Sequence, residues 1–218
     1  PRPAILYVHG QGKTTDAAAG GKIEELVRSG YVVAAPDLLG YGETRYKFTG
    51  GHAPVQPFFN ALMSGRSVAG INAGDAVRVL NFLQDREDVK ADQIGAVAVG
   101  DVAAAVLHAA AFEDQIRWLV LAESLLDYQS VVMHPLYDVN ANALVAGALS
   151  AYDLPDLLAS IAPRRVALLQ PTNQLRAAAS EDQITASLSF VEQHARDRLR
   201  VETQEVELKQ LIQWCTAP

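Results

Sequence analysis

The chain has 218 residues, of which 50% are hydrophobic and 20% are charged. That length fits one large domain or two small ones, and the composition supplies a sizeable core, which excludes an intrinsically disordered protein. The formal net charge of −7 gives an acidic surface, which argues against nucleic acids and anionic membranes as partners. The single cysteine, Cys215, excludes an intramolecular disulfide framework, and no apolar run reaches the ~18 residues that a bilayer-spanning helix needs.

Apolar runs that end at Gly or Pro alternate along the chain with segments in which apolar residues recur at helical spacing. Strands are predicted at 4–9, 31–35, 94–99, 117–122, 166–170 and 199–203. Helices are predicted at 21–28, 61–84, 102–112, 181–195 and 206–214, and a long excursion at 126–162 contains a turn and helix in its YDLPDLL segment. Because strand–helix–strand units connect parallel strands, these elements predict an α/β fold: a mostly parallel sheet of about six strands with helices on both faces.

The sequence shows no repeats, low-complexity tracts or linkers, so residues 1–218 are predicted to form a single domain. The first residue is Pro and leads directly into a strand, so we expect the natural chain to begin upstream. Ligands of parallel sheets bind outside the carboxyl ends of the strands. The loops that follow the predicted strands are therefore expected to share one rim and to carry the functional site.

The first of these loops reads HGQG over residues 9–12. Glycine lets such a loop turn closely and aim backbone N–H groups at a developing oxyanion, so Gly10 and Gln11 are candidate oxyanion-loop residues. A glycine-rich connection that binds nothing is the simpler alternative. The Lys-Thr pair that follows does not complete a phosphate-binding loop, because a leading Gly would have to replace Tyr7. After the second strand, Asp37 is predicted to hold nearby backbone N–H groups rather than to act in catalysis.

Residues 94–111 predict a buried strand, a glycine turn and a helix of small residues, which is the layout of a nucleophile elbow. The turn holds Asp101 and Val102, and it has no Ser or Cys. If Gly100 is the leading glycine of a G-x-S-x-G motif, the inert Val102 occupies the nucleophile position, whereas counting back from the helix places Asp101 there. We favour Asp101, which is either a carboxylate nucleophile or a cap for the helix N-terminus. The backbone N–H of Val102 is a second candidate oxyanion donor.

The other members of a catalytic triad are missing from their usual places. Asn173 follows the strand at 166–170, where a triad acid is expected, and no histidine follows the strand at 199–203. Glu123 comes directly after the strand that ends at Ala122, which makes it a candidate substitute acid.

Four histidines lie outside the HGQG loop. His52 and His134 fall in predicted loops and either could enter the site, whereas His108 and His194 fall in predicted helices. We expect His108 in the core or on a helix face and His194 at the surface. No group of His, Cys, Asp and Glu has metal-ligand spacing, so no metal and no cofactor are predicted.

Beside the HGQG loop, six short segments carry a family signal: LHAAA (107–111), SLLDY (124–128), PLY (135–137), GAL (147–149), YDLPDL (152–157) and APR (162–164). Together they resemble acetyl xylan esterase-like α/β-hydrolases over nearly the whole chain. The resemblance implies a three-layer α/β-hydrolase fold in which Ser, His and Asp remove acetyl groups from carbohydrates. Mapped onto this chain, the Ser position falls on Asp101, the acid position on Asn173 and the His position on no identifiable residue. The chain is also similar to tandem or C-terminal domains of that group in which the hydrolase motifs are worn away.

Three functions follow from these observations. The first is a catalytically degenerate hydrolase-fold domain. The second is an active ester hydrolase that uses Asp101, with the backbone N–H groups of Gln11 and Val102 as oxyanion donors and a loop histidine as proton shuttle, acting on an acetylated carbohydrate or a small ester. The third is a non-catalytic carbohydrate-binding module in which tyrosines of the excursion stack on sugar rings: Tyr128, Tyr137 and Tyr152.

Overall fold

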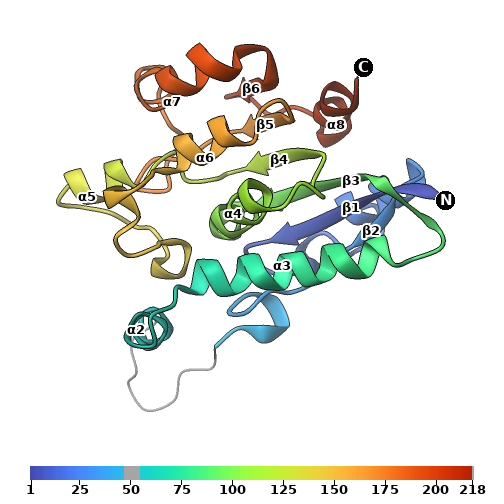
Figure 1. Ribbon diagram of the computed structural model, residues 1–218, viewed down its shortest axis with the longest axis horizontal. Helices are drawn as coiled ribbons and strands as arrows, with labels where there is room; N and C mark the ends of the chain where they lie inside the picture. Colours follow the sequence, from blue (N-terminus) through green and yellow to red (C-terminus); the bar gives the residue numbers. More distant parts are fainter. Residues whose placement is uncertain (47–54, 218) are drawn as a thin grey trace.

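The computed structural model describes residues 1–46 and 55–217 and contains one sheet of six parallel strands. The strand order is β2-β1-β3-β4-β5-β6, and the arrowheads of the central strands point toward the side on which α2 and α5 lie (Figure 1). The strands are β1 Arg2–His9, β2 Val32–Ala34, β3 Val89–Val99, β4 Trp118–Ala122, β5 Arg165–Leu169 and β6 Leu199–Glu202. All six predicted strands and their parallel arrangement are confirmed.

Helices cover both faces of the sheet, which gives the three-layer architecture that the sequence predicts. The helices are α1 Lys22–Arg28, α2 Gln56–Met63, α3 Val68–Gln84, α4 Ala103–Phe112, α5 Gln129–Met133, α6 Leu154–Ser160, α7 Glu181–Ala195 and α8 Leu208–Thr216. Short 3-10 turns are η1 Lys13–Thr15, η2 Gly42–Thr44, η3 Gly100–Val102, η4 Ala141–Ala143, η5 Ala148–Ser150 and η6 Arg196–Arg198. In the described ranges, no helix combines the length and apolar character needed to cross a membrane.

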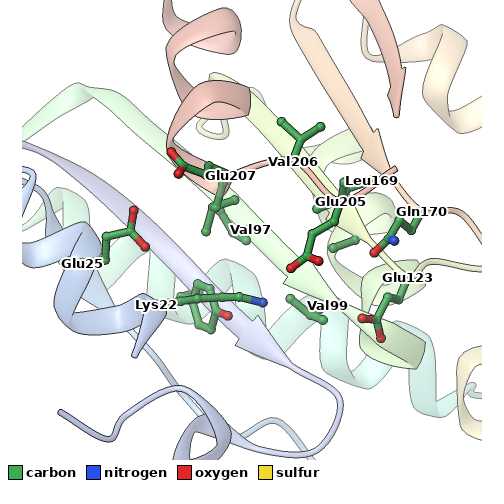
Figure 2. Close-up of a pocket in the computed structure, with 13 residues that line it drawn as sticks. Lys22, Glu25, Val97, Val99, Glu123, Leu169, Gln170, Glu205, Val206 and Glu207 are labelled. Carbon is green, nitrogen blue, oxygen red and sulfur yellow. The ribbon is translucent and has the colours of Figure 1, made fainter. Parts of the chain in front are cut away.

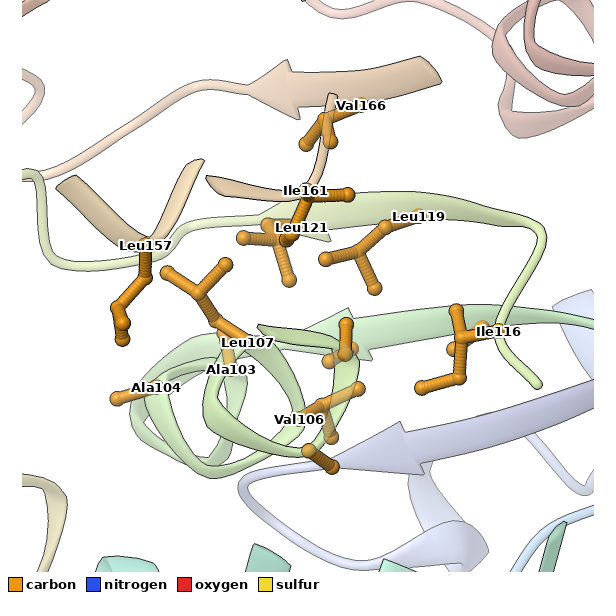
Figure 3. Close-up of a cluster of buried hydrophobic side chains, with 14 of the residues drawn as sticks. Ala103, Ala104, Val106, Leu107, Ile116, Leu119, Leu121, Leu157, Ile161 and Val166 are labelled. Atoms are coloured by element: carbon orange, nitrogen blue, oxygen red, sulfur yellow. The ribbon is translucent and has the colours of Figure 1, made fainter. Parts of the chain in front are cut away.

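The two faces of the sheet build two separate cores because side chains alternate along each strand. On β1, Leu6 and Val8 face a core completed by α3, α4, α6 and α7, whereas Ile5 and Tyr7 face a smaller core completed by α1 and α8. Figure 3 shows the larger core where α4 and α6 pack against β4 and β5. Burial of β1 on both faces explains why this strand reads as a continuous apolar run.

The predicted helix at 61–84 is wrong, because the structure has two helices there, α2 and α3. Gly65, which follows the C-cap residue Ser64 of α2, adopts a left-handed φ of 70°. Ser67 then caps α3, since its hydroxyl accepts a hydrogen bond from the Gly70 N–H at 2.9 Å. A glycine and a capping serine therefore interrupt a pattern that apolar spacing alone joins.

Candidate functional site

A cavity of about 1030 Å³ lies at the carboxyl ends of the strands. Its walls come from the loop after β1, the segment around η2, the turn after β3, the excursion around η4 and the loop after β5. The lining residues are Gly10, Gln11, Thr15, Gly40, Tyr41, Arg45, Tyr46, Val55, Asp101, Tyr137, Asp138, Val139, Asn140, Ala141, Asn142 and Arg176. We call this space the elbow cavity. Among the described residues that line it, there is no Ser, Cys or His.

The turn between β3 and α4 bends at Gly100, which has a left-handed φ of 76°. A Cβ added at Gly100 would meet no atom within 4 Å, so this position opens onto free space. In a nucleophile elbow the attacking residue occupies the strained strand-to-helix turn. Asp101 follows the turn residue by one position, and Val102 is fully buried.

Asp101 points into the elbow cavity and is held in an ion pair. Its Oδ2 lies 2.5 Å from a guanidinium nitrogen of Arg176, and its side chain is 16% exposed. Burial raises the pKa of Asp101, while the Arg176 charge and a side-chain hydrogen bond from Asn140 oppose that rise, and the nearby Asp138 adds to it. Asp101 is therefore a partly desolvated carboxylate whose charge is balanced by a guanidinium.

The loop after β5 brings Arg176 to this position, and Asn173 shapes that loop. The Asn173 side-chain oxygen accepts the N–H groups of Leu175 at 2.9 Å and Ala177 at 3.2 Å. Arg176 sits between them in a left-handed conformation with φ 58°, and its N–H donates to the Asn173 carbonyl at 2.9 Å. Asn173 itself lines a different cavity of about 360 Å³ beside α5 and α7. The loop in which a triad acid was expected thus delivers a cation to the elbow cavity.

The loop after β1 turns its backbone N–H groups inward. The Gly10 N–H donates to the Val99 carbonyl at 2.8 Å, and the Gly12 N–H donates to the His9 carbonyl at 2.9 Å. The Gln11 N–H, which the sequence suggests as an oxyanion donor, donates to Nδ1 of His9 at 3.0 Å. Burial lowers the pKa of His9, which favours the neutral ring that can accept this bond. In this conformation the Gln11 N–H already has an acceptor.

Asp37 has the structural role that the sequence predicts. Its carboxylate accepts the Lys13 N–H at 2.7 Å and the Glu43 N–H at 3.0 Å, and it forms an ion pair with the Lys13 ammonium at 3.0 Å. Although burial opposes the effect, these backbone and ammonium donors lower the pKa of Asp37. The carboxylate therefore ties the loop after β2 to the loop after β1.

Glu123 does not line the elbow cavity. It lies in another cavity, of about 460 Å³, on the face of the sheet that α1 and α8 cover. Figure 2 shows Glu123 and Glu205 around the same space as Lys22. The structure therefore separates this candidate acid from Asp101, placing the two in different cavities.

Of the candidate histidines, those that the structure describes do not meet Asp101 either. His108 is buried, with Nδ1 at 2.6 Å from the Ala104 carbonyl and Nε2 at 2.9 Å from the Tyr152 hydroxyl. His134 lines the cavity that contains Asn173, and His194 is exposed on α7. His52 lies outside the described residues.

Of the three tyrosines suggested for sugar stacking, Tyr137 alone lines the elbow cavity. It is 59% exposed, whereas Tyr128 is 4% exposed and donates its hydroxyl to the Ala143 carbonyl at 2.8 Å. Tyr152 bonds His108 instead. In the described parts of the chain, no group of three or more His, Cys, Asp or Glu side chains could hold a metal ion.

Sequence reasoning missed several polar residues of the elbow cavity, four of which are Arg45, Asn140, Asn142 and Arg176. One signal pointed to Arg176, because it lies in the loop that follows β5 and that loop was expected at the rim. The other three belong to connections without a motif, and their approach depends on how those connections fold.

No protein-family model matches the chain. The chain is 27% identical over 217 residues to "Putative hydrolase YtaP" of Bacillus subtilis (strain 168), a match that covers 92% of this chain and 71% of that protein.

Two solved structures share the fold. One, named as a putative acetyl xylan esterase from Bacteroides fragilis NCTC 9343, matches with a TM-score of 0.71 and 18% identity over 94% of this chain, which spans 59% of that structure's length. The other, an acetyl xylan esterase from Paenibacillus sp. R4, matches with a TM-score of 0.65 and 17% identity over 97% of this chain and 72% of that one. The chain is an α/β-hydrolase-fold domain.

Proposed function

We propose that this domain binds a carbohydrate ligand in the elbow cavity and does not hydrolyse it through a covalent intermediate. One observation carries the proposal: the elbow turns at Gly100, and the neighbouring Asp101 is paired with Arg176 at 2.5 Å. A residue without a side chain cannot attack an ester. A carboxylate paired with a guanidinium is a weakened nucleophile, because attack would withdraw negative charge from its counter-ion.

The size of the expected catalytic loss supports a binding role. In a serine protease, removal of the catalytic residues lowers kcat by roughly 10⁶, and oxyanion donors with substrate binding retain roughly 10³ to 10⁴ over the reaction in water. In this chain the Gln11 N–H already donates to His9, so even that residual contribution is reduced. Ligand binding, by contrast, requires neither catalytic residues nor oxyanion donors.

The cavity walls suit a sugar. Tyr137 presents an exposed ring that can stack on a sugar face, and Asn140, Asn142 and Arg176 offer planar polar groups for hydroxyls. The solved structures named as acetyl xylan esterases share the fold, and this favours a xylan-type carbohydrate as the ligand.

Ester hydrolysis through Asp101 is the second candidate. Its specific support is that burial raises the pKa of Asp101, as occurs for carboxylates that take part in catalysis. This candidate requires that substrate binding separate Asp101 from Arg176.

Two measurements test the proposal. Turnover of p-nitrophenyl acetate and acetylated xylan is measured for the wild type, Asp101→Ala and the control Asp92→Ala, which removes an exposed carboxylate from β3. Xylo-oligosaccharide binding is measured by calorimetry for the wild type and Tyr137→Ala. We expect no turnover above background and binding that Tyr137→Ala weakens. Turnover that Asp101→Ala abolishes and Asp92→Ala retains would establish the second candidate instead.

A further inference from the structure

One wall of the elbow cavity carries a cation with no ion pair among the described residues. Arg45 is exposed beside η2, and no carboxylate of the described chain pairs with it. Residues 47–54, which follow it, contain no Asp or Glu. The other arginine of the cavity, Arg176, is balanced by Asp101. Arg45 is therefore the arginine of this cavity that lacks an ion pair among the described residues.

The cavity has a second carboxylate, that of Asp138. The charge of Asp138 acts on Asp101, whose pKa it raises, and the Asp138 backbone N–H is bound to the Gln174 carbonyl at 2.8 Å. Asp138 thus lies on the side of the ion pair between Asp101 and Arg176. An anionic group of a ligand would give Arg45 an ion pair that the described residues do not supply.

A second group in the same cavity lacks a partner. Asn142 is 6% exposed, and its side-chain oxygen has no hydrogen-bond partner. Its backbone N–H is used, because it donates to the side-chain oxygen of Asn140 at 3.1 Å. Buried polar atoms in native proteins are nearly always satisfied, so the unpaired oxygen of this cavity-lining residue indicates a donor supplied from outside the chain.

These two groups have complementary requirements. Arg45 requires an acceptor that carries negative charge, and the Asn142 oxygen requires a hydroxyl donor. We propose that the ligand is an acidic sugar whose carboxylate pairs with Arg45 and whose hydroxyl donates to Asn142. This inference rests on the proposed carbohydrate-binding function and narrows its ligand to sugars of the uronic acid class.

Three probes with the same xylotriose backbone test the charge requirement by calorimetry at low salt. They are xylotriose, xylotriose substituted with glucuronic acid, and the methyl ester of that substituted sugar, which keeps the substituent and removes its charge. We expect the wild type to bind the free acid about tenfold more tightly than the ester, as one charge-assisted hydrogen-bonded contact provides. The preference should shrink as salt is added.

Matched variants assign the preference to its residues. Arg45→Ala should abolish the preference for the free acid and leave the affinity for xylotriose unchanged, whereas Arg66→Ala, which removes another exposed arginine, should alter neither. Asn142→Leu should weaken all three sugars, with folding verified by circular dichroism.

The outcomes separate this inference from the proposed function. Equal affinity for acid, ester and xylotriose would overturn the acidic-sugar inference and leave carbohydrate binding intact. A preference for the acid that survives in Arg45→Ala would also overturn it. Absence of binding for all three probes would overturn both proposals together.

Discussion

Arg176 and Asp101 join two loops that lie 75 positions apart in the sequence, through an ion pair of 2.5 Å between two residues that line the elbow cavity. The pair links the turn after β3 to the loop after β5. In hydrolases of this fold, those two loops carry the nucleophile and the acid. Here the same loops meet through opposite charges, so the contact can stabilise the rim without any third residue.

Asp101 and Arg176 should be energetically coupled through their ion pair. Arg176→Ala leaves a desolvated carboxylate without its counter-ion, which destabilises the fold, and Asp101→Asn in the same chain should recover part of that loss. We expect a coupling energy of about 1–2 kcal/mol in a double-mutant cycle measured by urea denaturation, below the value for a fully buried pair because half of the Arg176 side chain is exposed.

A second pair in the same molecule serves as the control. Asp75 and Arg78 on α3 have the same 2.5 Å separation, but their side chains are 37% and 76% exposed. Their cycle should give about 0.5 kcal/mol or less, because solvent screens them. Equal coupling in the two cycles would contradict a role for burial at Asp101.

Gly100 should accept a reactive side chain. The position opens onto free space, so Gly100→Cys should fold and lose only about 1–2 kcal/mol for the left-handed φ of 76°. Its thiol should react with iodoacetamide. The native Cys215 gives an internal control, because it is 7% exposed and burial raises the pKa of its thiol to about 12.

Mass spectrometry would count the labels after a short reaction. We expect no label on the wild type and one on Gly100→Cys, located by peptide mapping. A folded Gly100→Cys chain that resists labelling would show that the turn residue does not open onto free space.

The sequence could predict the sheet because strands buried on both faces leave long apolar runs, and each run ends at a turn residue. It also placed the site at the strand ends, since parallel strands share one edge. The nucleophile register could not be settled in the same way. The two possible registers placed the nucleophile position at Asp101 or at Val102. The bend instead falls on Gly100, whose positive φ is a property of the folded turn.

The polar walls of the cavity were harder to predict. Arg176 reaches Asp101 only because Asn173 folds its loop back with two side-chain hydrogen bonds. Asn173 was predicted at the acid position because it follows β5, whereas Arg176, three positions later, carries the charge. Pairing between loops depends on tertiary structure, so local pattern alone did not place Asp101 and Glu123 in separate cavities.

His108 should make stability depend on pH. Burial lowers the pKa of His108 below the ordinary value of about 6.5, although the hydrogen bond to the Ala104 carbonyl opposes this effect. The folded state therefore keeps the ring neutral, while the unfolded state binds a proton below pH 6.5. The free energy of unfolding should fall as the pH drops below that value, until the folded-state pKa is reached.

Urea denaturation between pH 8 and pH 5 would measure this dependence, compared with His108→Gln. Subtracting the two curves removes the contributions of the carboxylates, such as the raised pKa of Asp153. We expect the wild type to lose more stability than His108→Gln over this range. Parallel curves for the two proteins would remove His108 from the pH response.

Two glycine-to-alanine substitutions should act in opposite directions. A Cβ at Gly95 on β3 would overlap the indole ring of Trp118 on β4, whereas a Cβ at Gly74 on α3 would meet only the end of Arg78 at 3.8 Å. Gly95→Ala should therefore destabilise the chain by about 3 kcal/mol through overpacking of the smaller core. Gly74→Ala should stabilise it by about 0.5–1 kcal/mol, because alanine restricts the unfolded chain and favours the helix. Thermal unfolding of the two variants beside the wild type measures both effects, and a stable Gly95→Ala would show that Trp118 can move without disturbing the sheet.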